Sequence, residues 1–284
     1  MEFFHYINEY VFFLGMFLFL FVIAELAFHY GRYTSKRKER ADDLSTQAST
    51  VAGTLLGLLA LLLGFAFAMA LGRFEHRKEL LLKEINDIQT AYLRADLLPE
   101  NSRDAIKSSF ADYTLLRVNY YKQGTFASEM QSNIEETIAL QQRMWNETVA
   151  VYNTPDAKVS QTNLFTNALS SVFDDQTNRT VIRNDHVPEA ILWLLIFVAV
   201  MAICTSTYAL GLRNATIFLP RIVWILAISS VMTIIIDLDR PIRGIIQINQ
   251  HDMLDLHHAI MKDVEASKGK PAIADSFERI EIEK

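Results

Sequence analysis

The charged residues with the most suggestive spacing stand at the end of the last long apolar stretch, which reads Asp237-Leu-Asp239-Arg240-Pro-Ile-Arg243-Gly. Two carboxylates and two guanidinium groups surround a proline and a glycine, where a helix must bend or end. At a membrane boundary this cluster can form an ion-pair latch between helix ends, or a charged vestibule that selects ions. The density of opposite charges favours the latch.

Glu25 and His29 form a second pair, four residues apart on one face of the first apolar stretch. A carboxylate within a membrane is costly, so it indicates a functional site by default. Glu25 is only about two helical turns from Arg32, however, so its side chain can reach the membrane interface or pair with a basic neighbour such as Arg221. This structural interpretation is favoured over a functional one.

A third group consists of His251, Asp255 and His258, which share one face of an expected helix. Nitrogen and oxygen ligands at this spacing can hold zinc, but a zinc site needs a fourth ligand and a supporting shell, and neither can be identified. We therefore expect a solvated polar face and no metal site. The apolar residues around it indicate an amphipathic segment that lies on the bilayer or on another helix.

The second apolar stretch carries a regular series of small residues. They follow one another at steps of three or four and so lie on one face of a helix: Gly53, Gly57, Ala60, Gly64, Ala68 and Gly72. Such a face lets helix backbones approach closely in lipid. It predicts either packing within one subunit or packing against other copies around a pore. In a pore, an apolar constriction that gates by dewetting would come from Leu63, Phe65, Phe67 and Met69.

These groups depend on four long apolar stretches for their positions. The predicted membrane-spanning helices cover residues 10–31, 51–72, 189–210 and 217–237, and each has about the 20 residues that cross a bilayer. Helices are expected because only they satisfy every backbone group of such a segment in lipid. The sequence therefore predicts an all-α membrane protein with four transmembrane helices.

The remaining segments are polar. Residues 32–50 are predicted as a basic loop, residues 73–188 as a helical soluble domain inserted between the second and third spans, and residues 238–284 as an amphipathic C-terminal segment and tail. The helix of the second span is expected to continue beyond the membrane to Leu98, where Pro99 stops it. Caps and breaks at regular intervals predict an antiparallel helical bundle for the inserted domain.

The distribution of basic residues suggests an orientation. No Lys or Arg precedes the first span, whereas the loop after it carries Arg32, Lys36, Arg37, Lys38 and Arg40. The positive-inside rule places this loop in the cytoplasm and the N-terminus outside. With four spans, the inserted domain is then outside too. The basic residues at the exit of the second span oppose this orientation.

Composition excludes several function classes. The chain has a net charge of −6 and no long basic tract, which excludes nucleic-acid binding as a main role. Its only cysteine, Cys204, excludes an intramolecular disulfide framework. The sequence contains no nucleophile elbow, phosphate-binding loop or H-E-x-x-H motif, so we assign no catalytic residue and no cofactor, and expect no enzyme.

Three segments carry a resemblance to a known family. They are residues 52–57 continuing to 73–78, then Ala-Tyr-Leu-Arg-Ala-Asp-Leu-Leu-Pro at 91–99, and finally Asp-Leu-Asp-Arg-Pro-x-Arg-Gly at 237–244. In this order they resemble the bacterial bestrophin-like family of four-span membrane proteins. The resemblance covers about residues 45–256, and the last segment is the most distinctive.

The resemblance implies kinship with bestrophins, which are pentameric ion channels whose second span lines a narrow apolar neck. On that analogy Gly57, Gly64, Phe65 and Met69 face the pore. One departure is the basic first loop, which places the middle region outside, whereas bestrophins keep theirs in the cytosol.

Taken together, these features predict a homo-oligomeric ion channel of the bacterial plasma (inner) membrane, a pentamer by analogy, whose partners are the lipid bilayer and a small ion. Cations would be favoured by Asp237, Asp239 and Glu25, whereas anions would be favoured by Arg240, Arg243 and helix N-termini. The sequence therefore does not determine which ion is conducted. The alternative is a non-conducting membrane scaffold or signalling protein that acts through its helical soluble domain.

Overall fold

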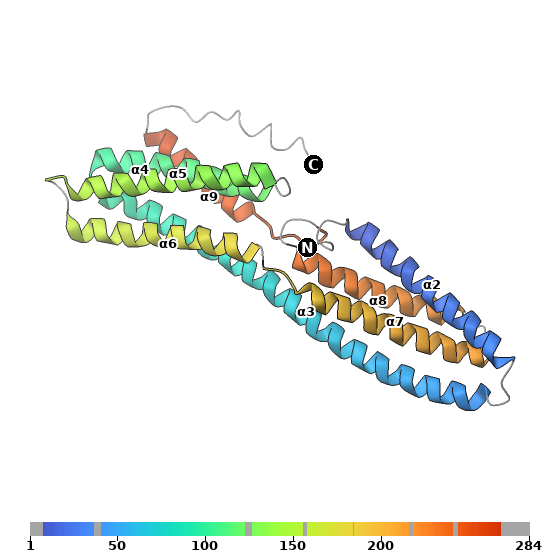
Figure 1. Ribbon diagram of the computed structural model, residues 1–284. Coiled ribbons are helices and arrows are strands. Elements are labelled where there is room, and N and C mark those ends of the chain that lie inside the picture. The colour runs from blue at the N-terminus through green and yellow to red at the C-terminus, as the bar shows by residue number, and fades with distance from the viewer. Residues whose placement is uncertain are drawn as a thin grey trace. The chain divides into compact units, whose positions relative to one another are not determined.

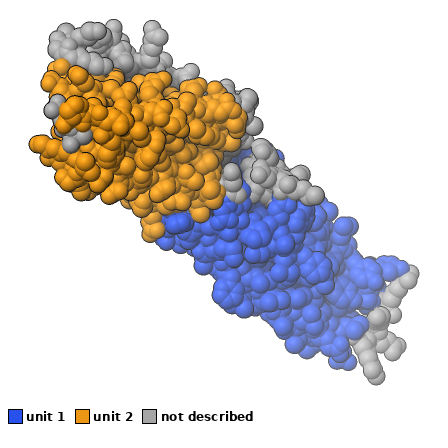
Figure 2. Space-filling model, turned by 60° about the vertical axis from the view of Figure 1, so that its left-hand side comes forward, with its two compact units in different colours: residues 1–76, 185–247 blue, residues 77–184, 248–284 orange. Residues whose placement is uncertain are grey.

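Helices make up the secondary structure of the described chain (Figure 1). The computed structural model describes residues 8–36, 41–122, 127–155, 158–183, 185–215, 218–240 and 244–267. No strand occurs in these ranges, which confirms the all-α prediction. The chain divides into two compact units, coloured separately in Figure 2: residues 1–76 with 185–247, and residues 77–184 with 248–284.

In the described residues of the first unit, four helices lie together (Figure 1) and share one apolar core. They are α2 (Glu9–Ser35), the first part of α3 (Ala41–Arg94), α7 (Glu189–Leu212) and α8 (Phe218–Asp239). Helix α2 packs along both α7 and α8, whereas α7 and α8 contact each other at few points. Buried residues from all four helices form the core, among them Leu20, Leu59, Ala199 and Ile235.

All four of these helices are long and apolar enough to cross a membrane. Most residues in the apolar part of each helix are not buried. In an apolar 18-residue window of α3, only 17% of the residues are buried. A water-soluble protein rarely exposes such extended apolar surface, because water contact with it is unfavourable. The protein is therefore a membrane protein.

The first two helices extend further than predicted. Residues 32–50 were expected to form a loop, but α2 continues to Ser35 and α3 already begins at Ala41. The early start of α3 is favoured by Asp42 and Asp43, which lie in its first turn, where negative charge is stabilising.

Within the described part of the second unit, the rest of α3 and four further α-helices surround a separate core. Helix α3 ends at Arg94 and continues as a 3-10 turn, η1 (Ala95–Leu97), before Pro99, which confirms the predicted continuation. There follow α4 (Glu100–Lys122), α5 (Ala127–Tyr152) and α6 (Val159–Arg183), and later α9 (His251–Ser267). Helix α4 packs against both α5 and α9, and α5 contacts α6.

Candidate functional site

The small-residue face of α3 is exposed along its full length. A Cβ added at Gly53, Gly57, Gly64 or Gly72 would meet no described atom within 4 Å outside its own stretch of helix. The side of α3 that packs into the core of the first unit is a different one, formed by Leu59, Ala66 and Ala70. Packing within one subunit, one of the two interpretations of these residues, is therefore absent from the described chain.

Large apolar side chains border this face. At about 100° per residue, Phe65 lies about 100° round the helix from Gly64, and Phe67 lies about 60° away on the other side. Both side chains are exposed, as is that of Met69. Met69 lies about 140° from Gly64, nearer the packed side than Phe65 and about as near to it as Phe67. The small residues thus form a smooth strip between Phe65 and Phe67.

Close backbone approach in this unit occurs elsewhere, between α2 and α7. A Cβ at Gly31 would overlap the carbonyl oxygen of Tyr208, and one at Gly211 would overlap that of Phe28. The rings of Tyr30 and Tyr208 stack beside this contact, with centroids 5.8 Å apart. The two glycines therefore set the spacing of α2 and α7.

Asp237 of the charged boundary cluster stabilises the turn that follows α8. Its buried carboxylate accepts the backbone N–H groups of Ile245, at 3.0 Å, and Ile246, at 2.9 Å. Gly244 has a φ of +116°, and a Cβ there would overlap the Asp237 carboxylate. Glycine tolerates this backbone conformation and leaves room for the carboxylate. The spacing of Asp237 and Gly244 is thus explained by one capped turn.

Asp239 and Arg240 connect α8 to other segments of the first unit. Both carboxylate oxygens of Asp239 lie 3.0 Å from the backbone nitrogen of Val187, which precedes α7. The side chain of His186 lies 3.5 Å from the same carboxylate, and Arg240 lies 3.7 Å from Glu9 at the start of α2. These contacts correspond to the latch interpretation. Arg243 lies outside the described residues.

Glu25 forms an ion pair with Arg221 of α8, at 2.6 Å, which confirms the pairing suggested by the sequence. His29 lies 3.9 Å from the same carboxylate. The guanidinium of Arg221 also lies over the ring of Phe28, 4.8 Å from its centroid. The guanidinium of Arg221 thus has an aromatic ring and an opposite charge beside it, which agrees with the structural interpretation of Glu25.

Helix α9 carries His251, Asp255 and His258, the residues considered for zinc. Among the described residues, no three His, Cys, Asp or Glu side chains come together in a way that could hold a metal ion. His257, which precedes His258 in the sequence, is buried. Its Nδ1 is 2.9 Å from the hydroxyl oxygen of Thr114 on α4, so it joins α9 to α4. Burial lowers the pKa of His257.

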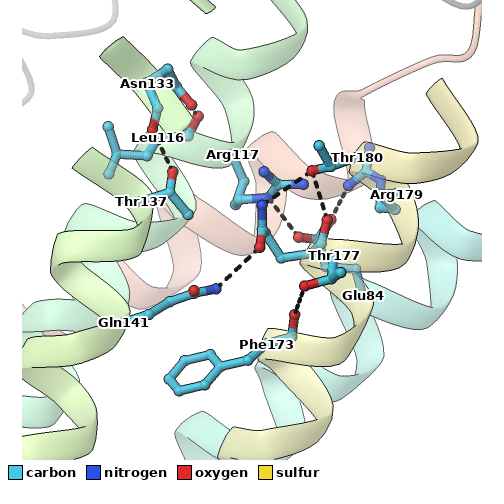
Figure 3. A network of polar contacts seen from close by, with 11 residues as sticks. Glu84, Leu116, Arg117, Asn133, Thr137, Gln141, Phe173, Thr177, Arg179 and Thr180 are labelled. Atoms are coloured by element: carbon cyan, nitrogen blue, oxygen red, sulfur yellow. Dashed lines mark hydrogen bonds and ion pairs between the residues drawn. The ribbon is translucent and has the colours of Figure 1, made fainter. Parts of the chain in front are cut away.

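A group of buried charges in the second unit belongs to the network of Figure 3. Arg117 of α4 and Arg179 of α6 both point toward Glu84 of α3; the Arg117 Nε lies 2.6 Å from Glu84 Oε1, and Arg179 donates to the other oxygen. Burial would raise the pKa of Glu84, but the two guanidinium charges and their hydrogen bonds outweigh burial, so its pKa lies below the ordinary value. The network ties three helices together.

The family model described as "Bestrophin-like domain" matches residues 18–253, most of the chain. The chain belongs to the bestrophin-like family. This confirms the resemblance carried by residues 52–57, 91–99 and 237–244. No curated protein matches this bestrophin-like chain significantly.

Solved structures share the fold of this bestrophin-like protein. A bacterial bestrophin homologue from Klebsiella pneumoniae is similar with a TM-score of 0.66 and 15% identity, over 91% of this chain and 99% of the homologue. A single-substitution variant of the Klebsiella homologue gives a TM-score of 0.65 and 13% identity, over 89% and 98%. A further structure, described only as a membrane protein with one substitution, gives 0.62 and 14%, over 92% and 100%. At these identities the similarity concerns the fold.

Sequence reasoning missed the buried charges of the bestrophin-like chain, although their spacing carries a signal. Glu84 stands three residues after Leu81 and four before Ile88, which places it on the core-facing side of α3. Arg179 likewise follows the buried Val172 by seven residues on α6. An acid and a base on apolar helix faces indicate a buried pair, but which helices meet follows only from the tertiary fold.

Proposed function

We propose that this bestrophin-like protein is a homo-oligomeric ion channel in which the small-residue face of α3 lies toward the symmetry axis. The observation that carries the proposal is the exposure of this face, from Gly53 to Gly72, on a helix long enough to span the membrane. A glycine-rich face favours close contact between helices in lipid, and within the described chain it has no such contact. Other copies of α3 supply it.

An assembly of this kind places apolar side chains beside the axis. Phe65 and Phe67 border the small-residue strip, and Met69 follows one turn after Phe65. A ring of such side chains forms a constriction whose wetting controls conduction of a small ion. A pentamer, by analogy with bestrophins, is the assembly that we propose.

The charges of the first unit act in the fold rather than in selecting the ion. Asp237 and Asp239 accept backbone N–H groups, and Glu25 pairs with Arg221. The proposed constriction of α3 therefore determines which ions pass, through its width and its apolar surface.

Ion flux into liposomes that contain the purified full-length protein tests the proposal. We expect flux from the wild type and a several-fold change for Phe65→Ala. Phe197→Ala is a matched control, because Phe197 on α7 is 61% exposed and Phe65 is 62% exposed. Absence of flux from a folded oligomer would refute conduction, and equal effects of both variants would refute the position of Phe65.

For the location we propose the bacterial inner membrane, with the N-terminus outside, because the basic residues gather in the first loop. Single cysteines in a Cys204→Ser background test the orientation. An impermeant maleimide applied to intact cells should label Asn101→Cys, and it should label Lys36→Cys only after the membrane is opened. The reverse pattern would place the second unit in the cytoplasm.

One observation favours a non-conducting scaffold as a second candidate. Helix α5 exposes a row of apolar side chains on a water-facing unit, namely Ile138, Trp145, Val149 and Tyr152. Such a row on a polar helix is typical of a protein contact. Liposomes without flux, together with loss of a co-purifying protein in Trp145→Glu, would favour this function over conduction.

A further inference from the structure

A groove opens between α7 and α8, near the end of α7 and the beginning of α8. Its volume is about 270 Å³, and its lining is mostly apolar. The lining residues from α7 are Ile203, Ser206, Thr207 and Leu210, and those from α8 are Pro220, Arg221, Trp224 and Ile225. The groove exists because α7 and α8 pack against α2 more than against each other.

Arg221 supplies the polar end of this groove. Its side chain is only 8% exposed, and its terminal nitrogen donates to Glu25 at 2.6 Å. The Nε of Arg221 is also buried, yet it has no hydrogen-bond partner among the described residues. A buried donor without a partner is unfavourable, so a ligand with an acceptor oxygen at this point stabilises the site.

The position of the groove along the helices matches the membrane interface. Arg221 lies in the first turn of α8, which begins at Phe218. Trp224 lines the groove, and the stacked rings of Tyr30 and Tyr208 lie at the same end of α2 and α7. Trp and Tyr are enriched at the level of lipid headgroups, where one side of the ring is apolar and the other is hydrated.

The charges at this end favour an anionic occupant. Arg221 and Glu25 together carry no net charge. Arg32, Lys36 and Arg213 are exposed where α2 and α7 end, and they outnumber the exposed Asp42 and Asp43 at the start of α3. The contact of Gly31 with Gly211 brings these two helix ends together. Exposed basic side chains beside a membrane surface attract anionic lipid headgroups.

We propose that the groove binds an anionic glycerophospholipid. One acyl chain lies along the apolar lining between α7 and α8, and a phosphodiester oxygen accepts the Nε–H of Arg221. The exposed apolar residues beside the groove, Leu219 and Val223, face the hydrocarbon from which the acyl chain enters. A small polar metabolite does not match this lining, because few polar groups converge in it. The proposal is independent of ion conduction.

Native mass spectrometry of the full-length protein, delipidated in detergent and titrated with phosphatidylglycerol or phosphatidylcholine, tests the proposal. We expect one tightly bound phosphatidylglycerol per subunit and at least tenfold weaker binding of phosphatidylcholine. Ser206→Phe fills the groove and should weaken phosphatidylglycerol binding about tenfold. Ser230→Phe is the control, because Ser230 lies about half a turn round α8 from Arg221 and should leave binding unchanged.

A second variant addresses the polar contact without leaving a charge unpaired. The double change Glu25→Gln with Arg221→Gln removes both charges together and should reduce the preference for phosphatidylglycerol to less than threefold. Thermal unfolding in detergent establishes that each variant is folded. Wild-type affinity in folded Ser206→Phe, or equal binding of both lipids by the wild type, would overturn the proposal. Cross-linking of Ser206→Cys between subunits would also overturn it, because a second copy would then occupy the groove.

Discussion

Asp239 at the end of α8 holds the backbone N–H of Val187 between its two carboxylate oxygens, each 3.0 Å from the nitrogen. Val187 stands two residues before α7, so the Asp239 side chain connects the end of α8 to the segment that leads into α7. The Asp237 carboxylate does the same for the turn after α8. Short polar side chains thus replace the backbone pairing that these segments lack outside the helices.

Asp239→Ala should destabilise the first unit, because the buried N–H of Val187 then has no acceptor. The expected loss is about 1–3 kcal/mol in the free energy of unfolding. Thermal unfolding of the purified protein in detergent measures it. Asp255→Ala on α9 removes an exposed carboxylate and is the control. Equal melting temperatures for Asp239→Ala and the wild type would contradict the latch.

Glu84→Gln should destabilise the second unit strongly. Without the carboxylate, Arg117 and Arg179 remain as two buried positive charges beside each other. Loss of one partner from a buried ion pair costs about 3–5 kcal/mol. Glu75→Gln changes an exposed carboxylate on the same helix and should have little effect. A chemical-denaturation series separates the two variants, and equal midpoints would refute the importance of the network.

Asp175 on α6 gives the second unit a dependence on pH. Burial raises its pKa to about 6, although its contact with Lys83 acts in the opposite direction. The folded protein therefore binds a proton more readily than the unfolded chain, and the stability from this group is present below about pH 4 and is lost as the pH rises through about 6. The loss is on the order of 1–3 kcal/mol.

Asp175→Asn tests this pH dependence, because asparagine resembles the protonated carboxyl group. Stability measured between pH 4 and 7 should fall less steeply for Asp175→Asn than for the wild type. Glu84, with its lowered pKa, contributes stability that is lost as the pH falls, and it does so in both proteins. The difference between the two curves therefore isolates Asp175. Parallel curves would show that Asp175 does not titrate in this range.

Two glycines of spanning helices should respond differently to the same change. Gly31→Ala forces α2 and α7 apart, because its Cβ would overlap the carbonyl of Tyr208, and about 1–3 kcal/mol of stability should be lost. Gly53→Ala adds a methyl group where the subunit has open space and should leave the stability of the subunit unchanged or slightly raised. Melting temperatures of Gly31→Ala and Gly53→Ala, measured side by side, test whether the two glycines differ in this way.

Gly64→Leu should disrupt assembly while it leaves the subunit folded, because a bulky side chain prevents close approach of another copy of α3. The molecular mass in detergent, from size-exclusion chromatography with light scattering, measures the oligomer. Gly15→Leu on α2 is the control, since Gly15 is also exposed with open space around it. An unchanged mass for Gly64→Leu would place the small-residue face away from the contact between subunits.

Much of the fold follows from the sequence because the membrane constrains it strongly. Four apolar stretches of this length must form helices in lipid, because helices satisfy all their backbone groups, and the described chain is all-α as expected. The continuation of α3 to Pro99 followed from helix chemistry. The length of the first loop could not be predicted in this way. Residues 41–50 are polar but helical, and hydropathy alone does not distinguish a polar helix from a polar loop.

The candidate site was less accessible to sequence reasoning. The glycine series of α3 indicated close packing, but periodicity does not say which partner a face meets. Among the described residues these glycines meet no other helix, so internal packing does not account for them. The close pair is instead Gly31 and Gly211, two isolated glycines at distant positions in the chain. The pairing of Glu25 with Arg221 could be foreseen, because both charges stand near the ends of apolar stretches and need a partner.

Cys204 is the only cysteine of the chain, and on α7 its thiol is exposed. Because Cys204 lies within a membrane-spanning helix, one dye per protomer is better attached at Asn101→Cys in a Cys204→Ser background, where a single thiol remains. Single complexes labelled in this way lose their fluorescence in discrete steps, and the number of steps reports the stoichiometry of the assembly directly.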